Sequence, residues 1–387
     1  MSSLIVEIVK VDNIKKHPNA DTLDIVIVKG WQVITKSKQI EIGDNVVYFQ
    51  PDCMLRQKLA ERLNITNYLS SSGRVKSIKL RQEASHGFIV NVNEFPELKK
   101  YKVGDNVAEI LDVHKYEQII PINSLLRGGN DTKLPDLPTF TRYTDIENFR
   151  NFNNILQDDE EVNVTEKIHG TNCRVGLVNG KWECGSHNVR RSVESSYFGE
   201  LYWYIKKWLH WCYENKGFVK FRFKYTKNIN NIYRYPLSLP GVKEMLEMVS
   251  RNMKATSIIL YGEIFGDVQD LKYGRKSGEY DFAAFDISVN GRYLDYGNFL
   301  LVCNKFNIPT VPLILEGSWS SFKDLLERIS SGNTFVKDRE GKDIKQIREG
   351  IVIKLKEERR DEKLGRVVLK YISNDYYTRK GNLTEFK

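Results

Sequence analysis

The chain has 387 residues, of which 59 are lysine or arginine and 50 are aspartate or glutamate, so its formal charge is +9. Hydrophobic residues make up 41% and aromatic residues 11%. This composition excludes a wholly disordered chain, a collagen-like repeat and a small disulfide-rich scaffold, and the length favours two domains. The positive charge favours a polyanionic partner such as a nucleic acid.

The sequence has no sign of export or of a membrane span. The first residues lack a basic segment, their apolar run is broken at Glu7, and no run of about 18 apolar residues follows. The five cysteines are scattered and form no C-x-x-C pair, which predicts reduced thiols with neither zinc nor disulfides. We therefore expect an intracellular protein, cytoplasmic or nuclear, without membrane contact.

Residues 1–118 are predicted to form a β-rich N-terminal domain. Turn residues separate short β-branched runs, a spacing typical of a small OB-like barrel; the expected strands are residues 4–9, 23–28, 45–49, 74–80, 87–92 and 106–111. Two Gly-Asp-Asn-Val segments, from Gly43 and from Gly104, have unlike surroundings. We interpret them as two similar strand-entry turns rather than a repeat.

Two features of this domain bear on nucleic-acid binding. The segment His17-Pro18-Asn19-Ala20-Asp21-Thr22-Leu23 resembles the opening of the tRNA-binding OB domains attached to some aminoacyl-tRNA synthetases. A turn with a proline and a capping aspartate explains it equally well. Basic pairs at strand spacing could line a binding groove or form an ordinary solvated face; they are Arg74 with Lys76 and Lys79 with Arg81.

Residues 119–138 have the composition of a linker, with prolines and Gly128-Gly129-Asn130-Asp131. Beyond it, residues 139–387 alternate strand-like and helical patterns, with helices expected at 197–214, 241–251 and 321–330. Trp203, Trp208 and Trp211 on the first of these favour core packing over a base-stacking platform. The prediction is an α+β fold: an N-terminal β-barrel, then a domain of antiparallel sheets with flanking helices.

Candidate chemistry begins at Thr165-Glu166-Lys167-Ile168-His169-Gly170-Thr171-Asn172, which follows an apolar strand. A lysine there can act as a nucleophile when burial and neighbouring cations remove its proton. Gly170 would let a phosphate approach the backbone closely. Alone, the Lys-x-x-Gly pattern is also typical of a surface lysine at a strand end.

Four further segments follow in a fixed order, each an apolar strand with a distinctive residue. They are Ser257–Gly266 with Glu263, Tyr280–Ile287 with Phe282, Arg348–Lys354 with Glu349, and Arg366–Ile372 with Lys370. The set resembles the covalent nucleotidyltransferase superfamily of ATP-dependent DNA and RNA ligases and mRNA capping enzymes. The histidine at position 169, two residues after the motif lysine, resembles the RNA ligases. DNA ligases usually have aspartate at this position. The N-terminal OB-like module resembles the RNA ligases that seal 3′-OH/5′-phosphate nicks and have an amino-terminal OB domain.

This resemblance implies a mechanism. Lys167 attacks the α-phosphate of ATP to form lysyl-AMP, the AMP passes to an RNA 5′-phosphate, and a 3′-OH then displaces it. The resemblance also implies Mg²⁺ or Mn²⁺ held by Glu263 and Glu349 through water, with Lys354 and Lys370 on phosphate. The implied nucleotide-binding residues are Arg142, Glu166, Ile168, Gly170, Asn172 and Phe282, the last stacking on adenine.

Three positions differ from the family pattern or leave a choice. Arg190 or Arg191 could contact the 5′-phosphate or form a basic hairpin edge. Val368 stands where many ligases have the first lysine of the last motif, and Arg366 is the candidate substitute. His169 is interpreted as a positioning residue, because no second histidine or cysteine has metal-ligand spacing.

Three functions compete. The leading one is an ATP-dependent RNA ligase, monomeric, acting on RNA nicks or ends and accepting RNA/DNA hybrids. The second is a DNA ligase or a guanylyltransferase, which the N-terminal OB module and His169 disfavour. The third is an RNA-binding protein with a decayed ligase fold, which would need none of Lys167, Glu263, Glu349 and Lys370.

Overall fold

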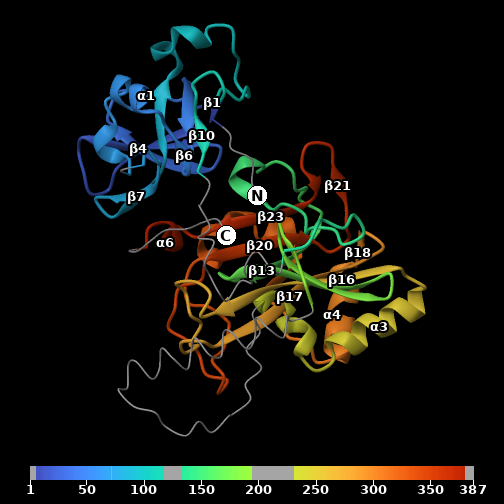
Figure 1. Ribbon diagram of the computed structural model, residues 1–387. Coiled ribbons are helices and arrows are strands. Elements are labelled where there is room, and N and C mark those ends of the chain that lie inside the picture. The colour runs from blue at the N-terminus through green and yellow to red at the C-terminus, as the bar shows by residue number, and fades with distance from the viewer. Residues whose placement is uncertain (1–5, 71, 117–132, 194–230, 380–387) are drawn as a thin grey trace, which may run out of the picture.

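The computed structural model of the protein describes residues 6–70, 72–116, 133–193 and 231–379. They form an α+β architecture: an N-terminal domain of small sheets, and a larger domain of two sheets with helices (Figure 1). No helix within these ranges is long and apolar enough to cross a membrane. The helix expected at 197–214, its tryptophans and most of the expected linker lie outside the described residues, so the domain boundaries stay a prediction.

The N-terminal domain consists of short antiparallel sheets. Strands β1, β5 and β9 form one sheet, β2, β3 and β4 another, while β7 pairs with β8 and β6 with β10. The bounds are β1 Val6–Lys10, β2 Asn13–Lys16, β3 Leu23–Val28, β4 Trp31–Lys36, β5 Asn45–Phe49, β6 Cys53–Met54, α1 Gln57–Arg62, β7 Ser77–Leu80, β8 Glu83–His86, β9 Phe88–Asn91 and β10 His114–Lys115. Hydrogen-bonded ladders among the described residues do not close into a barrel.

The prediction of a strand at residues 106–111 is wrong. Only Asn106 pairs with a strand, as an isolated bridge to Glu7, and the chain then turns, with Leu111 N donating to Val107 O. Val107, Ala108 and Leu111 all enter the core of this domain. That spacing suits one face of a helical turn rather than the alternation of a strand.

The larger domain contains two main sheets that face each other, and β21 and β22 form a separate two-stranded sheet. One main sheet has the order β15-β14-β13-β16-β17-β18, and the other has the order β11-β23-β20-β12-β19. The strand bounds are β11 Glu147–Asn148, β12 Glu161–Lys167, β13 Thr171–Val178, β14 Lys181–Ser186, β15 Arg190–Arg191, β16 Ser257–Gly266, β17 Tyr280–Val289, β18 Arg292–Tyr293, β19 Leu313–Ser318, β20 Gly350–Leu355, β21 Arg360–Asp361, β22 Gly365–Arg366 and β23 Val368–Ile372. The helices are α3 Val242–Met253, α4 Tyr296–Lys305, α5 Leu326–Ser330 and α6 Asn374–Tyr377.

Strand alternation decides which side chains lie between the two sheets. Successive residues point to opposite faces, so every second residue of a strand shares a face. On β16 and β17 the outward residues join α3 and α4 in one core cluster. On β12 and β20 the outward residues, such as Val164 and Ile353, form another cluster with Trp319. The remaining residues of these strands, including Lys167 and Glu263, therefore face the space between the sheets.

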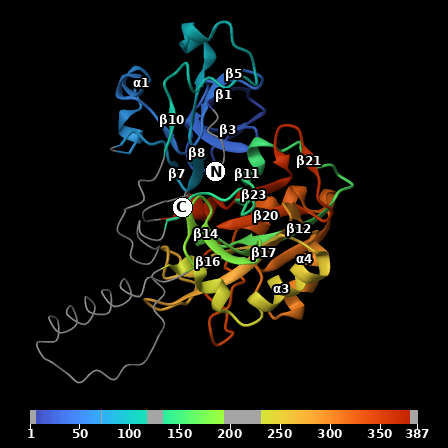
Figure 2. The ribbon, with the colours of Figure 1, turned by 45° about the vertical axis from the view of Figure 1, so that its right-hand side comes forward.

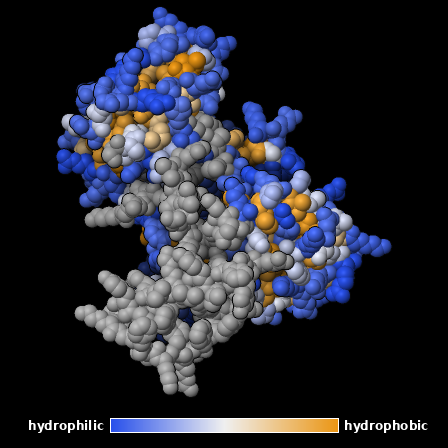
Figure 3. All heavy atoms as spheres, in the orientation of Figure 1, coloured by the Kyte–Doolittle hydropathy of each residue, from blue (hydrophilic) through white to orange (hydrophobic). Residues whose placement is uncertain are grey.

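The two domains share a hydrophobic core. Ile372, Tyr376 and Tyr377, at the end of β23 and in α6, cluster with Val26, Val33 and other interior residues of the N-terminal domain. In Figure 1, α6 lies just beneath the N-terminal domain, and Figure 2 shows the same junction from another side. Elsewhere the visible surface is mostly hydrophilic, with small hydrophobic patches (Figure 3). The C-terminal end of the described chain thus fixes the N-terminal domain in place.

His86 is the titratable group at this junction. Its Nε2 donates to Asn374 Oδ1 at 2.7 Å, and its Nδ1 lies 3.0 Å from Ser77 Oγ. Burial, together with the nearby charge of Arg150, lowers the pKa of His86 to about 3. The histidine is therefore neutral in the folded protein at physiological pH.

We expect the folded protein to lose stability on acidification because of His86. An unfolded histidine titrates near 6.5, so between about pH 6.5 and pH 3 only the unfolded state takes up this proton. The loss should approach about 1.4 kcal/mol per pH unit in that window. The measurement is the difference in unfolding free energy between wild type and His86→Gln at pH 7.5 and pH 5. For comparison, His114→Gln changes an exposed histidine; equal pH dependence in all three proteins would contradict the prediction.

Candidate active site

Lys167 and Glu349 form the centre of the candidate site. Strand β12 ends at Lys167, which lies opposite Gly350 of β20, so the residue that precedes β20 meets the lysine. Lys167 Nζ donates to Glu349 Oε1 at 2.7 Å, and Glu349 is only 4% exposed. Burial alone would raise the pKa of Glu349, but the positive charges of Lys167 and His169 lower it to about 2. Glu349 is therefore ionised and holds the lysine in place.

Glu263 enters the same space from the opposite sheet. It lies on β16 opposite Asn172 of β13, in the strand pair that follows the turn at Gly170. A Cβ atom at Gly170 would lie 2.2 Å from the Ile264 carbonyl oxygen and 2.9 Å from Glu263 Cγ. Glycine is thus required here so that the turn can pack against β16, a reason different from the predicted approach of phosphate. Burial raises the pKa of Glu263 to about 8, with Glu349 adding to the effect and Lys167 opposing it.

Lys370 shares the inner face of the second sheet with Lys167. It lies opposite Val352 of β20, and Val352 lies opposite Thr165 of β12. Lys115, from the N-terminal domain, comes near it: burial and the charge of Lys370 both lower the pKa of Lys115. A lysine from the N-terminal domain therefore lies near Lys370 of the larger domain.

His169 is held by partners at both ring nitrogens. Its Nε2 lies 2.5 Å from Asp270 Oδ1, and its Nδ1 lies 3.0 Å from the Tyr376 hydroxyl and 3.5 Å from Glu349 Oε2. Burial lowers the pKa of His169, but the carboxylates of Asp270 and Glu349 outweigh it, so the pKa is raised. The geometry agrees with the interpretation of His169 as a positioning residue.

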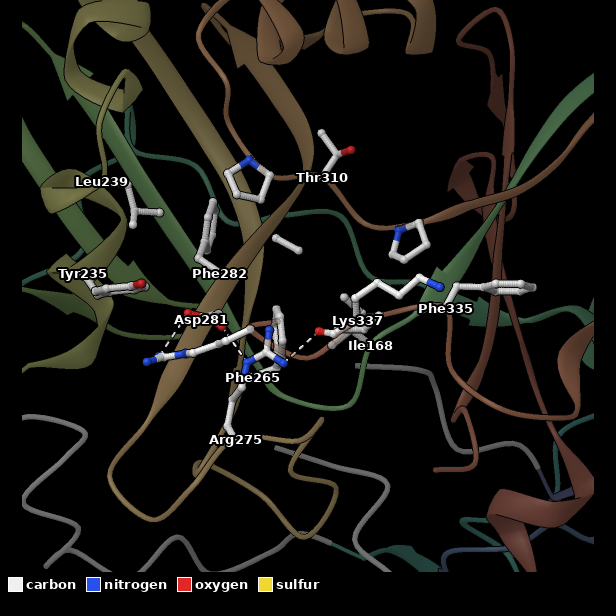
Figure 4. A pocket seen from close by; sticks show the side chains of 15 residues that line it. Ile168, Tyr235, Leu239, Phe265, Arg275, Asp281, Phe282, Thr310, Phe335 and Lys337 are labelled. Atoms are coloured by element: carbon white, nitrogen blue, oxygen red, sulfur yellow. Dashed lines mark hydrogen bonds and ion pairs between the residues drawn. The ribbon is translucent and has the colours of Figure 1, made fainter. Parts of the chain in front are cut away.

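A pocket of about 470 Å³ adjoins the Lys167 turn at Ile168. Its lining includes the apolar residues Phe265, Phe282 and Ala283 together with the cationic residues Arg275 and Lys337 (Figure 4). Arg275 lies in the wall, where its Nε donates to Asp281 Oδ2 at 2.6 Å. Two predicted nucleotide-binding residues, Ile168 and Phe282, thus line one pocket.

Lys354 is not placed to hold a phosphate, contrary to the prediction. It is 3% exposed, and its Nζ donates to Asp286 Oδ2 at 2.8 Å. Arg366 Nη2 donates to the same oxygen at 2.8 Å, as does the Tyr143 hydroxyl at 2.9 Å. Arg366 is therefore committed to a buried ion-pair network and does not substitute for the lysine replaced by Val368.

Phe282 points to the helix side of its sheet. It is 2% exposed and belongs to the core cluster of α3 and α4, packed against Gly262. A base between the two sheets would not stack on its ring, so the predicted role does not fit. Phe285, three residues further, is half-buried and clusters with Ile168 and Ala283. A bulge opposite Tyr261 and Gly262 turns this part of β17 toward the inner face.

The other predicted nucleotide-binding residues, Glu166, Asn172 and Arg142, differ in burial and in hydrogen bonding. Glu166 is buried, and its carboxylate accepts from Thr334 Oγ1 at 2.5 Å and from Phe335 N at 2.7 Å. Asn172 faces the inner space beside Glu263, and its Oδ1 is buried without a hydrogen-bond partner in the described structure. Arg142 lies at the surface, 49% exposed, in an ion pair with Asp136.

Some of the predicted nucleic-acid-binding side chains are bonded to other residues of the protein, and others are exposed to solvent. Arg74 is 6% exposed; its Nε donates to Asp52 Oδ1 at 2.6 Å and it stacks on Tyr116, so it does not line a solvated groove. Arg190 makes a bidentate pair with Glu183 at 2.7 and 2.8 Å, and Arg191 beside it is half-buried. Exposed cations remain on and beside the β7–β8 hairpin: Lys76, Lys79 and Arg81.

The histidine-proline segment of the N-terminal domain has a structural role. His17 is 5% exposed, and its Nε2 lies 3.1 Å from the Leu80 carbonyl oxygen. Asn19 Nδ2 donates to the Arg81 carbonyl oxygen at 2.9 Å. Both side chains therefore pin the turn of the β7–β8 hairpin, and this accounts for the motif without any RNA contact of its own.

Comparison with known proteins decides the family. The RNA ligase family matches residues 160–372, more than half of the chain, and an OB-fold domain family matches residues 5–92. The chain belongs to the RNA ligase family. It therefore has the domain order expected from the sequence, with the OB-fold domain before the ligase domain. A search of curated protein sequences finds no significant match.

Solved structures of Naegleria gruberi RNA ligase have the same fold as this RNA ligase. A lysine-to-alanine variant with ATP and Mn gives a TM-score of 0.71 at 21% identity, covering 96% of this chain and 97% of that chain. The enzyme with pyrophosphate gives 0.70 at 22% identity, covering 97% and 98%. An aspartate-to-alanine variant without ligand gives 0.67 at 21% identity, with the same coverage.

Several residues of this RNA ligase's site were missed in the sequence. Asp286 could have been found, because a carboxylate within an apolar strand needs a buried partner. Lys115, Asp270 and Tyr376 carry no local signal. They lie far along the chain from Lys167 and come near the site only through folding.

Proposed function

We propose that this RNA ligase uses ATP to join RNA 3′-OH and 5′-phosphate ends through a lysyl-AMP intermediate on Lys167. The observation that carries the proposal is the placement of Lys167 Nζ, 2.7 Å from Glu349 Oε1, on an inner face shared with Lys370 and opposite Glu263. Lys167 would form a nitrogen–phosphorus bond at the α-phosphate and release pyrophosphate. The AMP would then pass to the RNA 5′-phosphate and leave when the 3′-OH attacks. Such transfers depend on positioning and charge neutralisation.

Glu263 and Glu349 fit a divalent cation held through water. The described residues contain no group of three acidic, histidine or cysteine side chains that could hold a metal alone, and Mg²⁺ normally keeps several waters. Among the described residues, Glu349 Oε2 is buried with no hydrogen bond and has His169 Nδ1 at 3.5 Å as an ion-pair neighbour. Burial and the charge of Glu349 raise the pKa of Glu263. An added cation would let both carboxylates ionise. Mg²⁺ or Mn²⁺ would supply charge neutralisation at the phosphates; the Naegleria enzyme has been captured with ATP and Mn.

The adenine base is proposed to lie between the sheets against Phe285, with the Ile168 pocket at its edge. Phe285 takes this role from Phe282 because it is on the inner side and keeps part of its ring exposed. Lys370 and Lys115 are proposed to hold phosphates, since Lys370 shares the inner face with Lys167 and its charge acts on Lys115. Anionic phosphate would relieve the repulsion between them.

The proposed substrates are nicked or broken RNA, with RNA/DNA hybrids accepted, and the enzyme is proposed to act as a monomer inside the cell, in cytoplasm or nucleus. Buried free cysteines at positions 53, 173, 184 and 303 support a reducing compartment. Arg190 and Arg191 form the edge strand β15 of the first sheet, and one of them is proposed to contact the 5′-phosphate; Glu183 already engages Arg190.

The test is covalent labelling followed by nick sealing. Purified protein, freed of bound AMP, is incubated with α-labelled ATP or GTP and Mg²⁺, and then with nicked RNA, nicked DNA or a hybrid. ATP-specific label and sealing of RNA nicks are expected. Label from GTP would indicate a capping enzyme, sealing of DNA alone would indicate a DNA ligase, and no label would favour an RNA-binding protein.

Neutralising the β7–β8 hairpin should weaken RNA binding. In Lys79→Ala/Arg81→Ala both exposed charges are lost, so up to two phosphate contacts disappear. Each contact contributes about 0.7–0.9 to the slope of log affinity against log salt, so the magnitude of the slope should fall by up to about 1.8. The matched control is Lys99→Ala/Lys100→Ala, which removes the same charge from the same domain away from this hairpin. Equal affinities and slopes for the two double variants would contradict an RNA contact at the hairpin.

A further inference from the structure

The segment from Ser373 to Tyr377 is bonded to the candidate active site on one side. Ser373 N donates to the Glu349 carbonyl oxygen at 3.0 Å, and Ser373 Oγ donates to the Arg348 carbonyl oxygen at 3.3 Å. The hydroxyl of Tyr376, which is 1% exposed, lies 3.0 Å from His169 Nδ1. The short helix α6 therefore touches both segments that meet at Lys167.

The same helix is bonded to the N-terminal domain on its other side. Asn374 Oδ1 accepts from His86 Nε2 at 2.7 Å, and the Tyr377 ring lies edge-on to His86 with ring centroids 5.0 Å apart. Tyr376 and Tyr377 both belong to the hydrophobic cluster of that domain. The position of the Tyr376 hydroxyl is thus set by the packing of two domains.

A continuous chain of contacts runs from Tyr376 to the nucleophile. His169 lies between the Tyr376 hydroxyl and Asp270, and its Nδ1 faces Glu349 Oε2 at 3.5 Å. The other oxygen of Glu349 accepts from Lys167 Nζ at 2.7 Å. Arg379 closes the arrangement, since it pairs with Asp270 at 3.1 Å and stacks on the Tyr376 ring at 3.5 Å.

We propose that Tyr376 is a positioning residue for lysine adenylylation, acting through His169 and Glu349 on Lys167. The inference rests on the proposed function, because it assumes that Lys167 receives AMP. The described contacts lead from the Tyr376 hydroxyl to Lys167 through His169 and Glu349, so the role is one of positioning. This hydroxyl fixes the imidazole ring, which otherwise could rotate about its bond to Cβ and no longer keep Nδ1 facing Glu349. Loss of the outer partner of a metal-ligating histidine lowers activity about 10–100-fold, and we expect a loss at the lower end of that range here.

The test compares Tyr376→Phe with Tyr377→Phe, which removes a hydroxyl one residue away. The Tyr377 hydroxyl accepts from Asn148 Nδ2 at 3.2 Å. Two rates are measured: formation of the AMP adduct from labelled ATP, and sealing of nicked RNA that already has a 5′-adenylate, a step that bypasses Lys167. Tyr376→Phe should lower adduct formation about 10-fold or more while sealing of adenylated RNA stays within about threefold of wild type. Tyr377→Phe should change neither rate.

Three outcomes decide the matter. The inference is overturned if Tyr376→Phe forms adduct as fast as Tyr377→Phe, or if its two rates fall in proportion, as a general loss of folded enzyme would produce. Should Tyr376→Phe not fold, Asp270→Asn tests the other nitrogen of His169; Asp270 is 45% exposed, and the same split between rates is expected. A wild-type chain that forms no adduct overturns the proposed function itself, which separates the two failures.

Discussion

Replacing Lys167 with alanine should abolish the AMP adduct, a loss of more than about 10³-fold. The amine is the group that bonds to phosphorus, and the two other described lysines of the inner faces are placed differently. Lys354 is locked to Asp286, and Lys370 lies on a different strand, opposite Val352. The measurement is the amount of protein labelled by α-labelled ATP on a denaturing gel.

Two further variants make the Lys167 test specific. Lys167→Arg keeps a positive charge beside Glu349 but offers no neutral nitrogen, because arginine stays protonated. It should therefore fail as completely as alanine. Lys181→Ala changes an exposed lysine and should label normally. If Lys167→Ala retained ATP-dependent label, another residue would be the nucleophile. Sealing of adenylated RNA by Lys167→Ala would show that the variant is folded.

Replacing Asp286 with asparagine should cost about 3–5 kcal/mol of unfolding free energy. Asp286 is fully buried, and its one oxygen accepts from Lys354, Arg366 and Tyr143. Burial alone would raise the pKa of this carboxyl, but Lys354 and Arg366 keep it lowered, so Asp286 is ionised. Asparagine keeps the shape but removes the charge, and two buried cations would then lack most of their compensation.

The control for the Asp286 variant is a substitution that breaks an exposed ion pair. Asp158→Asn breaks a pair with Lys323 whose side chains are 66% and 39% exposed, and such pairs contribute about 0–1 kcal/mol. Chemical unfolding of the two variants and wild type gives the measurement. A loss at Asp286 as small as the loss at Asp158 would mean that the buried network contributes little to stability. Lys354 could then be reconsidered as a phosphate contact.

Much of the architecture follows from local patterns in the sequence. The β-branched runs of the N-terminal domain predicted five of its strands. The order of the five motifs predicted the strands that bear Lys167, Glu263 and Lys370, and the strand that directly follows Glu349. The strand expected at 106–111 failed because apolar residues at one-, three- and four-residue spacings fit a buried turn as well as a strand.

Residue roles were predicted less well than strands. Lys354, Arg74 and Phe282 were assigned to ligands because their types suit phosphate, RNA and a purine. The structure gives them buried partners instead: Asp286, Asp52 and the helix-side core. A lysine or arginine in a sequence does not reveal whether an acidic partner lies across the fold. A phenylalanine in a bulged strand does not reveal which face it takes.

The sequence by itself determined the family, the nucleophile candidate and the order of the domains, because these depend on residue types in a fixed linear order. Only the tertiary structure decided which of those residues meet. Tyr376 and Asp270 reach His169 across 207 and 101 positions of the chain, and Lys115 reaches Lys370 from another domain. Contacts of this kind arise when sheets and domains pack, and their partners follow no sequence spacing. The geometry around Lys167 is therefore a property of the folded pair of domains.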